Sequence, residues 1–78
     1  PEPFLIDLML KFIFVGTAET VGELSTALRL PPRLVTDLLE SAVRGQLVAA
    51  LGSSSGALNM RYELVDGGKA RAREAMAR

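Results

Sequence analysis

The stretch 45-GQLVAALGSSSGALNMRYELV-65 decides the architecture of this chain. Gly45 ends a helical pattern, and the apolar run after it holds residues that suit a β-strand. Glycines and serines separate this run from a second one, which begins near Asn59. Two such runs joined by small residues are the signal of a β-hairpin. We therefore expect a hairpin over Leu47–Val65, with helices before it and one short helix after it.

Three helices are predicted ahead of the hairpin. The first covers residues 4–15, between a proline and a glycine. The second begins with Thr20-Val21-Gly22-Glu23, a capping box in which the hydroxyl of Thr20 and the carboxylate of Glu23 each accept from the other residue's amide. It runs to about Arg29. Leu30-Pro31-Pro32 then breaks this helix and starts the third, at residues 32–44.

A fourth helix is predicted after the hairpin, over residues 67–77, with Asp66 as its N-cap. Its weakly apolar side is expected to hold Ala70, Ala75 and Met76. A short strand around Glu19–Val21 is expected to pair with the hairpin. Two helices joined by a short turn and followed by a hairpin have the order of a winged helix-turn-helix. The expected fold class is therefore α+β, mainly α, with three helices, a β-hairpin wing and a C-terminal helix.

The composition describes one small domain, residues 1–78, and excludes several kinds of chemistry. Nine Lys and Arg balance nine Asp and Glu, so the basic excess typical of nucleic-acid-binding domains is absent. The chain has no cysteine and no histidine, which excludes disulfides, Cys/His zinc sites and imidazole acid/base chemistry. The carboxylates are scattered over different helices. We expect no catalytic residue, no cofactor and no metal.

The absence of cysteine is compatible with a cytosolic location, and the first helix argues against a membrane span or a signal peptide. The apolar run of this helix at residues 4–15 is shorter than the about 20 residues that a spanning helix needs, and no basic region precedes it. We expect no membrane contact and a cytoplasmic location. Because the chain begins with Pro rather than Met, we expect a domain excised from a longer protein.

The first helix has more apolar surface than one packed face requires. Its core side is expected to hold Leu5, Met9 and Phe12, flanked by Ile6, Leu8 and Ile13. Phe4 and Phe14 fall on the same side as Asp7 and Lys11, which mark an exposed stripe. A helix that is apolar nearly all round is normally covered on more than one side. A neighbouring domain or a second subunit is therefore expected to contact Phe4, Leu10 and Phe14.

The third helix is the element that reads DNA in winged-helix proteins. Its apolar stripe holds Leu34, Val35, Leu38, Leu39, Ala42 and Val43. If DNA is bound, the predicted contacts are Arg33, Thr36, Arg44, Arg61 and Lys69. Against this, Asp37 and Glu40 share the exposed face and would repel phosphates. The wing tip, Ser53–Ala57, carries no cation either. These charges favour a protein-facing or solvated surface over a DNA-binding one.

The sequence resembles two kinds of known winged-helix domain, and the second, closer resemblance covers nearly the whole chain. The run Tyr62–Ala72 resembles the Y-x-L-T-x-x-G-R-x-x-A ending of bacterial winged-helix domains, MarR-like regulators among them, with Val65 in place of the usual Thr and Lys69 in place of Arg. The segments Phe4–Lys11, Leu30-Pro31 and Tyr62–Gly68 resemble the winged-helix module before the nucleotide-binding domain of certain bacterial AAA-type ATPases. This second resemblance implies an accessory module without ATP binding of its own, because no Walker motif is present.

Two functions follow as hypotheses. The first is a non-catalytic accessory or regulatory domain that mediates protein–protein or interdomain contact in an AAA-type ATPase, as the neutral helix face, the uncharged wing tip and the apolar first helix suggest. The alternative is the DNA-binding domain of a bacterial transcription regulator, which rests on the fold by analogy.

Overall fold

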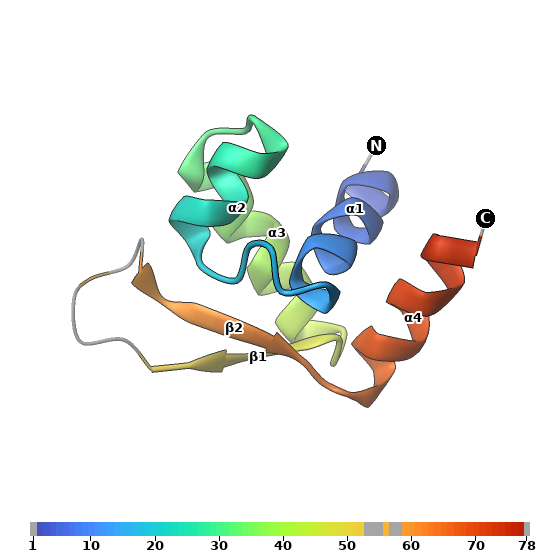
Figure 1. Cartoon of the computed structure of the whole chain (residues 1–78). Coiled ribbons are helices and arrows are strands. Elements are labelled where there is room, and N and C mark those ends of the chain that lie inside the picture. The colour runs from blue at the N-terminus through green and yellow to red at the C-terminus, as the bar shows by residue number, and fades with distance from the viewer. Residues whose placement is uncertain (1, 53–55, 57–58, 78) are drawn as a thin grey trace.

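The computed structural model describes residues 2–52, 56 and 59–77, and it has the predicted order of elements. The chain forms α1 (Glu2–Phe14), α2 (Val21–Leu28), α3 (Pro32–Arg44), β1 (Val48–Leu51), β2 (Arg61–Leu64) and α4 (Asp66–Ala77). The first three helices form a body, the hairpin runs along one side of it, and α4 lies beside α1 (Figure 1). None of the described helices combines the length and the apolarity that crossing a bilayer requires.

The start of α2 confirms the predicted capping box. The Glu23 amide donates to the Thr20 hydroxyl over 3.1 Å, and the Thr20 amide donates to the Glu23 carboxylate over 3.3 Å. The Glu19 amide donates to the same carboxylate over 2.9 Å. Because these amides have no partner within the helix, the cap fixes where α2 begins.

The hairpin pairs as expected, and the predicted third strand is a single bridge. β1 and β2 are antiparallel, with Val48 opposite Leu64 and Leu51 opposite Arg61. Thr20 forms an isolated bridge with Arg61, and the Tyr62 amide donates to the Glu19 carbonyl over 2.9 Å. The wing is thus attached to the residues that begin α2. Except for Gly56, the Ser53–Ala57 tip lies outside the described residues.

The core lies between α1, α2, α3 and the inner side of the hairpin. Its fully buried side chains include Met9, Leu10, Leu24, Val35 and Leu39. Leu10 was expected to contact a partner, but it is completely buried, so this prediction is wrong. Leu34 and Val43, at the edges of the predicted stripe of α3, are exposed. A helix packed on one side buries only the middle of such a stripe.

The position of α4 depends on a glycine. A Cβ added to Gly68 would overlap the carbonyl oxygen of Leu47, so only glycine allows this approach of helix and chain. Gly68, Ala72 and Ala75 face inward at helical spacing. The predicted apolar side is therefore wrong for Ala70 and Met76, which are exposed, and right for Ala75.

Polar contacts also join α4 to α1. The Nε of Arg71 lies 2.7 Å from Oδ1 of Asp7, and the guanidinium of Arg73 lies 5.6 Å from the ring centre of Phe14. Asp7 therefore bonds to α4, whereas the sequence predicts an exposed stripe. Part of the second cover that the apolar first helix requires comes from this chain itself. The expected contact of Phe14 with a neighbouring domain or a second subunit stays a prediction.

Candidate nucleic-acid interface

The turn between α2 and α3 is closed by a reciprocal pair of hydrogen bonds. The Leu30 amide donates to the Ser25 carbonyl over 3.2 Å, and the Ser25 hydroxyl donates to the Leu30 carbonyl. Arg29 lies between them in the left-handed conformation, at φ 58° and ψ 44°. A bond from the residue after a left-handed one back to the last turn is the Schellman pattern of helix ends. The turn therefore holds α3 at a fixed angle to α2.

The N-terminal end of α3 is open. Pro31 and Pro32 have no amide hydrogen to offer, and no side chain caps this end. The first turn of α3 also contains no acidic residue. The partial positive charge of the helix dipole is therefore uncompensated beside Arg33, which is exposed. The amides of Leu34 and Val35 donate to the Pro31 carbonyl, so what attracts an anion here is the helix dipole and the charge of Arg33 rather than a set of free amides.

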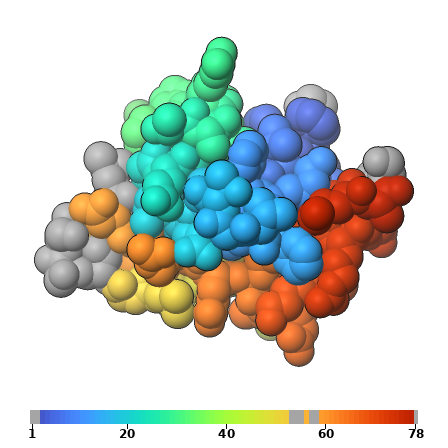
Figure 2. All heavy atoms as spheres, in the orientation of Figure 1, coloured from blue at the N-terminus to red at the C-terminus, as the bar shows by residue number. Residues whose placement is uncertain are grey.

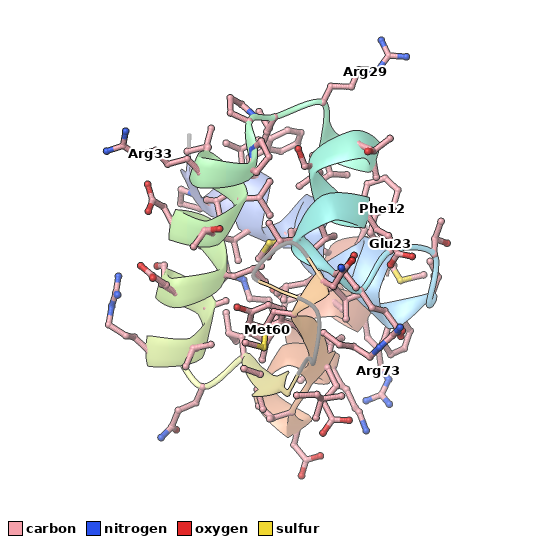
Figure 3. The ribbon with its side chains drawn as sticks, turned by 90° about the vertical axis from the view of Figure 1, so that its left-hand side faces the viewer. Phe12, Glu23, Arg29, Arg33, Met60 and Arg73 are labelled. Atoms are coloured by element: carbon pink, nitrogen blue, oxygen red, sulfur yellow. The ribbon has the colours of Figure 1, made fainter. Side chains whose placement is uncertain are left out.

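Arg29 and Arg33 project from this end, and neither forms an ion pair with a described residue. Figure 3 shows them on the two sides of the turn, both pointing away from the body. In the space-filling view of Figure 2, the turn (green) forms the top edge of the molecule. The ion pairs found among the described residues are Arg61–Glu19 and Arg71–Asp7, so neither arginine of the turn takes part in one.

Arg29 is not among the contacts that the sequence predicts. A signal was available, because it stands directly before Leu30-Pro31-Pro32 and four residues before Arg33. However, Arg29 is the expected last residue of a helix, and helical spacing does not predict where the side chain of such a residue points. Its left-handed conformation directs the side chain outward, and this depends on the turn that forms around it.

The other predicted contacts are spread over the molecule. Thr36 is half-buried on α3, and Arg44 lies at the opposite end of that helix from Arg33, about 16 Å away at 1.5 Å per residue. Lys69 is exposed on α4, which packs chiefly on α1. Arg61 belongs to β2 and is paired with Glu19. The structure thus concentrates free cations at the α2–α3 turn and leaves the others apart.

The carboxylates near this surface differ in their hydrogen bonding. Asp37 and Glu40 are exposed on α3, between Arg33 and Arg44. Glu23 has a lowered pKa, mainly because it accepts from the backbone amide of Glu19; the Thr20 amide and the charge of Arg61 act in the same direction, against desolvation. Glu23 is therefore ionised and committed to the cap of α2.

A second exposed surface lies on the outer side of α1. One hollow of about 260 Å³ is lined by Phe4, Asp7, Leu8, Lys11 and Ala75. A neighbouring one of about 180 Å³ is lined by Leu8, Lys11, Phe12, Val15, Thr17 and Met76. Phe4 is 62% exposed, Val15 56% and Met76 47%. Of the three predicted interface residues, Phe4 belongs to this surface, Leu10 is in the core, and Phe14 is half-buried under Arg73.

Val15 and Met76 belong to this surface but are not among the sequence-predicted contacts. Val15 directly follows the last residue of α1 and stands about three helical turns after Phe4, a spacing that places the two on one side. The position of Met76 depends on how α4 packs, which helical spacing alone does not reveal. We call Phe4, Leu8, Val15 and Met76 the α1 apolar surface.

Comparisons with known proteins identify the fold. No family model matches the chain, and no curated protein matches it either. The adhesin competence repressor AdcR from Streptococcus pyogenes is 22% identical, with a TM-score of 0.80 over 94% of this chain and 54% of that one. A mutant of Lactococcus lactis ZitR in apo form is 14% identical, with a TM-score of 0.83 over 97% of this chain and 57% of that one. The multiple antibiotic-resistance repressor MarR from Listeria monocytogenes is 15% identical, with a TM-score of 0.81 over 94% of this chain and 48% of that one.

These matches confirm the winged-helix fold and go no further at such low identity. The chain spans about half the length of the solved structures that it matches. The resemblance to MarR-like domains agrees with them at the level of the fold. They give no support to the resemblance to ATPase accessory modules.

Proposed function

We propose that this domain binds double-stranded DNA as the winged-helix part of a bacterial transcription regulator. The observation that carries the proposal is the start of α3, where Arg33 on the helix and Arg29 on the preceding turn form no ion pair with any described residue. Similar structures named as repressors support it. The accessory-module hypothesis rests on the neutral helix face, the uncharged wing tip and the apolar first helix. The exposed arginines at the start of α3 change the argument from the helix face, and the packing of α4 on α1 weakens the argument from the first helix.

The proposed mode of binding follows from the direction of α3. This helix enters the major groove with its N-terminal end towards the bases, as second helices of helix-turn-helix units do. Arg33 then contacts a base edge or a phosphate, and Arg29 contacts the backbone at the rim of the groove. Asp37, one turn further along, is placed to accept from a cytosine amino group. Arg44 approaches the backbone at the far end.

The balanced charge predicts a particular dependence on salt. The exposed surface of α3 and its turn carries three arginines and two carboxylates, so few counterions are released on binding. With about three phosphate contacts, log K should fall with log salt at a slope near −3. Non-specific binding is then weak, and recognition depends on the bases that Arg33 and Asp37 contact.

The test is a titration of a labelled duplex of about three helical turns at about 50 mM and about 200 mM salt. We expect binding at low salt, and a loss of roughly tenfold in affinity for Arg33→Ala. Arg73→Ala is the matched control, since it removes the same charge from α4, on the other side of the molecule in Figure 3. No binding at low salt, or equal losses for the two variants, would contradict the proposal.

We also propose that the α1 apolar surface joins two copies of this chain. An antiparallel pairing about a two-fold axis near Leu8 and Lys11 would bring Phe4 of one copy close to Val15 of the other. The exposure of Phe4, Val15 and Met76 supports this contact. A neighbouring domain is the alternative occupant that the sequence left open.

Sedimentation over a range of concentrations tests this contact. We expect a dimer that Phe4→Ser with Val15→Ser dissociates, while Leu34→Ser, an equally polar change on an exposed position of α3, leaves it intact. A chain that stays monomeric at every concentration would rule out the second copy and favour the neighbouring domain.

A further inference from the structure

Arg61 is the single cation of the hairpin, and its side chain already forms an ion pair with Glu19. Between Val48 and Leu64 the sequence contains one other charged residue, Glu63. The Nη1 of Arg61 lies 2.7 Å from Oε1 of Glu19, close enough for a charge-assisted hydrogen bond. Whatever the wing contributes electrostatically to binding a polyanion therefore depends on this pair.

The backbone holds the two residues beside each other. Thr20 bridges to Arg61, and the Tyr62 amide donates to the Glu19 carbonyl, so Glu19 and Arg61 lie on adjacent extended segments. The Glu19 amide in turn donates to the Glu23 carboxylate. Both the amide and the carbonyl of Glu19 are thus hydrogen-bonded. Its side chain needs little further ordering to reach the guanidinium.

The pair is nevertheless open to competition. The side chains of Arg61 and Glu19 are 52% and 36% exposed, and exposed ion pairs are weak. Glu23 is also near enough for the charge of Arg61 to lower its pKa, but its carboxylate is engaged by the amides that begin α2. Glu19 is therefore the carboxylate that determines whether Arg61 can bond to another anion.

We propose that Glu19 is an intramolecular competitor for DNA phosphate at Arg61, and so limits what the wing adds to binding. The inference rests on the proposed DNA binding. Glu19 occupies the guanidinium with a carboxylate, and a phosphate oxygen must displace it. Removing the negative charge of Glu19 releases Arg61 for one further phosphate contact. Glu19 is in this sense a positioning residue, because it acts on DNA through Arg61.

The test compares the unaltered protein with Glu19→Gln, Arg61→Ala and the double variant, all titrated with the same duplex over a range of salt. Glu19→Gln keeps the length of the side chain and the backbone bonds. We expect it to raise affinity about three- to tenfold at low salt and to steepen the salt slope by about 0.9, the value for one added phosphate contact. Arg61→Ala alone should lower affinity by less than about twofold, because the arginine is already occupied. The double variant should behave like Arg61→Ala.

Glu63→Gln is the matched control, since it removes the same charge from β2, the strand of Arg61, and leaves the Arg61–Glu19 pair in place. An equal gain for Glu63→Gln, or a gain for Glu19→Gln that persists without Arg61, would show general electrostatics and overturn the inference. A loss of about 0.9 in salt slope for Arg61→Ala alone would overturn the inference as well, since Arg61 would then already contact phosphate.

The same experiment separates this inference from the proposed function. If all four proteins bind the duplex with the same salt slope, only the competition at Arg61 is refuted, whereas binding by none of them refutes the proposed function too. A merely structural role of the pair would change thermal stability and leave the slope unchanged.

Discussion

Arginines on the two sides of the molecule have different partners. On the α1–α4 side, Arg71 bonds to Asp7 and Arg73 lies over the ring of Phe14. At the α2–α3 turn, Arg29 and Arg33 have no ion pair with any described residue and point into solvent (Figure 3). The same residue type thus joins two helices on one side and stays available on the other. Net charge, which is zero here, therefore says little about where a polyanion could bind.

The largest effect on the free energy of unfolding is expected for a core residue of α1. Leu10→Ala should lower the free energy of unfolding by roughly 4 kcal/mol, because it removes a completely buried side chain and leaves a cavity. Phe4→Ala, on the same helix, should change it by less than about 0.5 kcal/mol, since that side chain is exposed. Denaturant unfolding measures both. Similar losses for the two variants would mean that α1 is packed differently.

The approach of α4 to the hairpin gives the next effect. Gly68→Ala should cost about 3 kcal/mol of stability, because its Cβ would overlap the backbone oxygen of Leu47, which cannot move aside as a flexible side chain would. Gly52→Ala is the control, since nothing lies within 4 Å of the Cβ that it adds. Thermal or denaturant unfolding decides. A Gly68→Ala protein as stable as the parent would show that α4 does not sit against Leu47.

At the α2–α3 turn, one substitution is expected to raise the stability of the fold and to weaken DNA binding. Arg29→Gly should stabilise the fold by about 0.5 kcal/mol, because glycine adopts the left-handed conformation without the strain of a side chain. It should also weaken DNA binding. Gln46→Gly is the matched control, as it relieves a residue at φ 60° beyond the end of α3. Unfolding and duplex titration of both variants check this. If Arg29→Gly binds DNA as well as Gln46→Gly, Arg29 has no part in the contact.

The smallest effect concerns the cap that joins α2 to the wing. The pKa of Glu23 is lowered in the folded chain, so the unfolded chain binds its proton more readily. The stability that this carboxylate contributes is therefore present above the ordinary pKa of 4.5 and is lost as the pH falls through the lower folded value. Glu23→Gln should remove that part of the acid dependence of the melting temperature. Identical acid dependence in the two proteins would contradict the role of the cap.

Local chemistry explains why much of the fold could be predicted. The capping box at Thr20, the prolines before α3 and the small residues of the hairpin act on neighbouring residues, so each can be recognised from the chain alone. The core of α1 was predictable only in part. A helix with apolar side chains nearly all round does not reveal which of them face inward, and Leu10 was placed on the wrong side.

The candidate site was less accessible to such reasoning. Arg33 and Thr36 follow from their place near the start of a helix, but the importance of Arg29 depends on a left-handed conformation and on the Ser25–Leu30 bonds. Arg61 was predicted as a contact without its partner, because Glu19 is 42 residues away in the chain. Pairings over such distances depend on the packing of whole elements.

The elements, their order and the winged-helix class can be predicted from the chain, because propensity, capping and turn chemistry are local. Which arginines form ion pairs depends instead on how the elements pack. That choice is made where α4 meets α1 and where β2 meets the start of α2. Ion pairs form between whichever charged groups packing brings within a few ångströms, and spacing along the chain does not encode them.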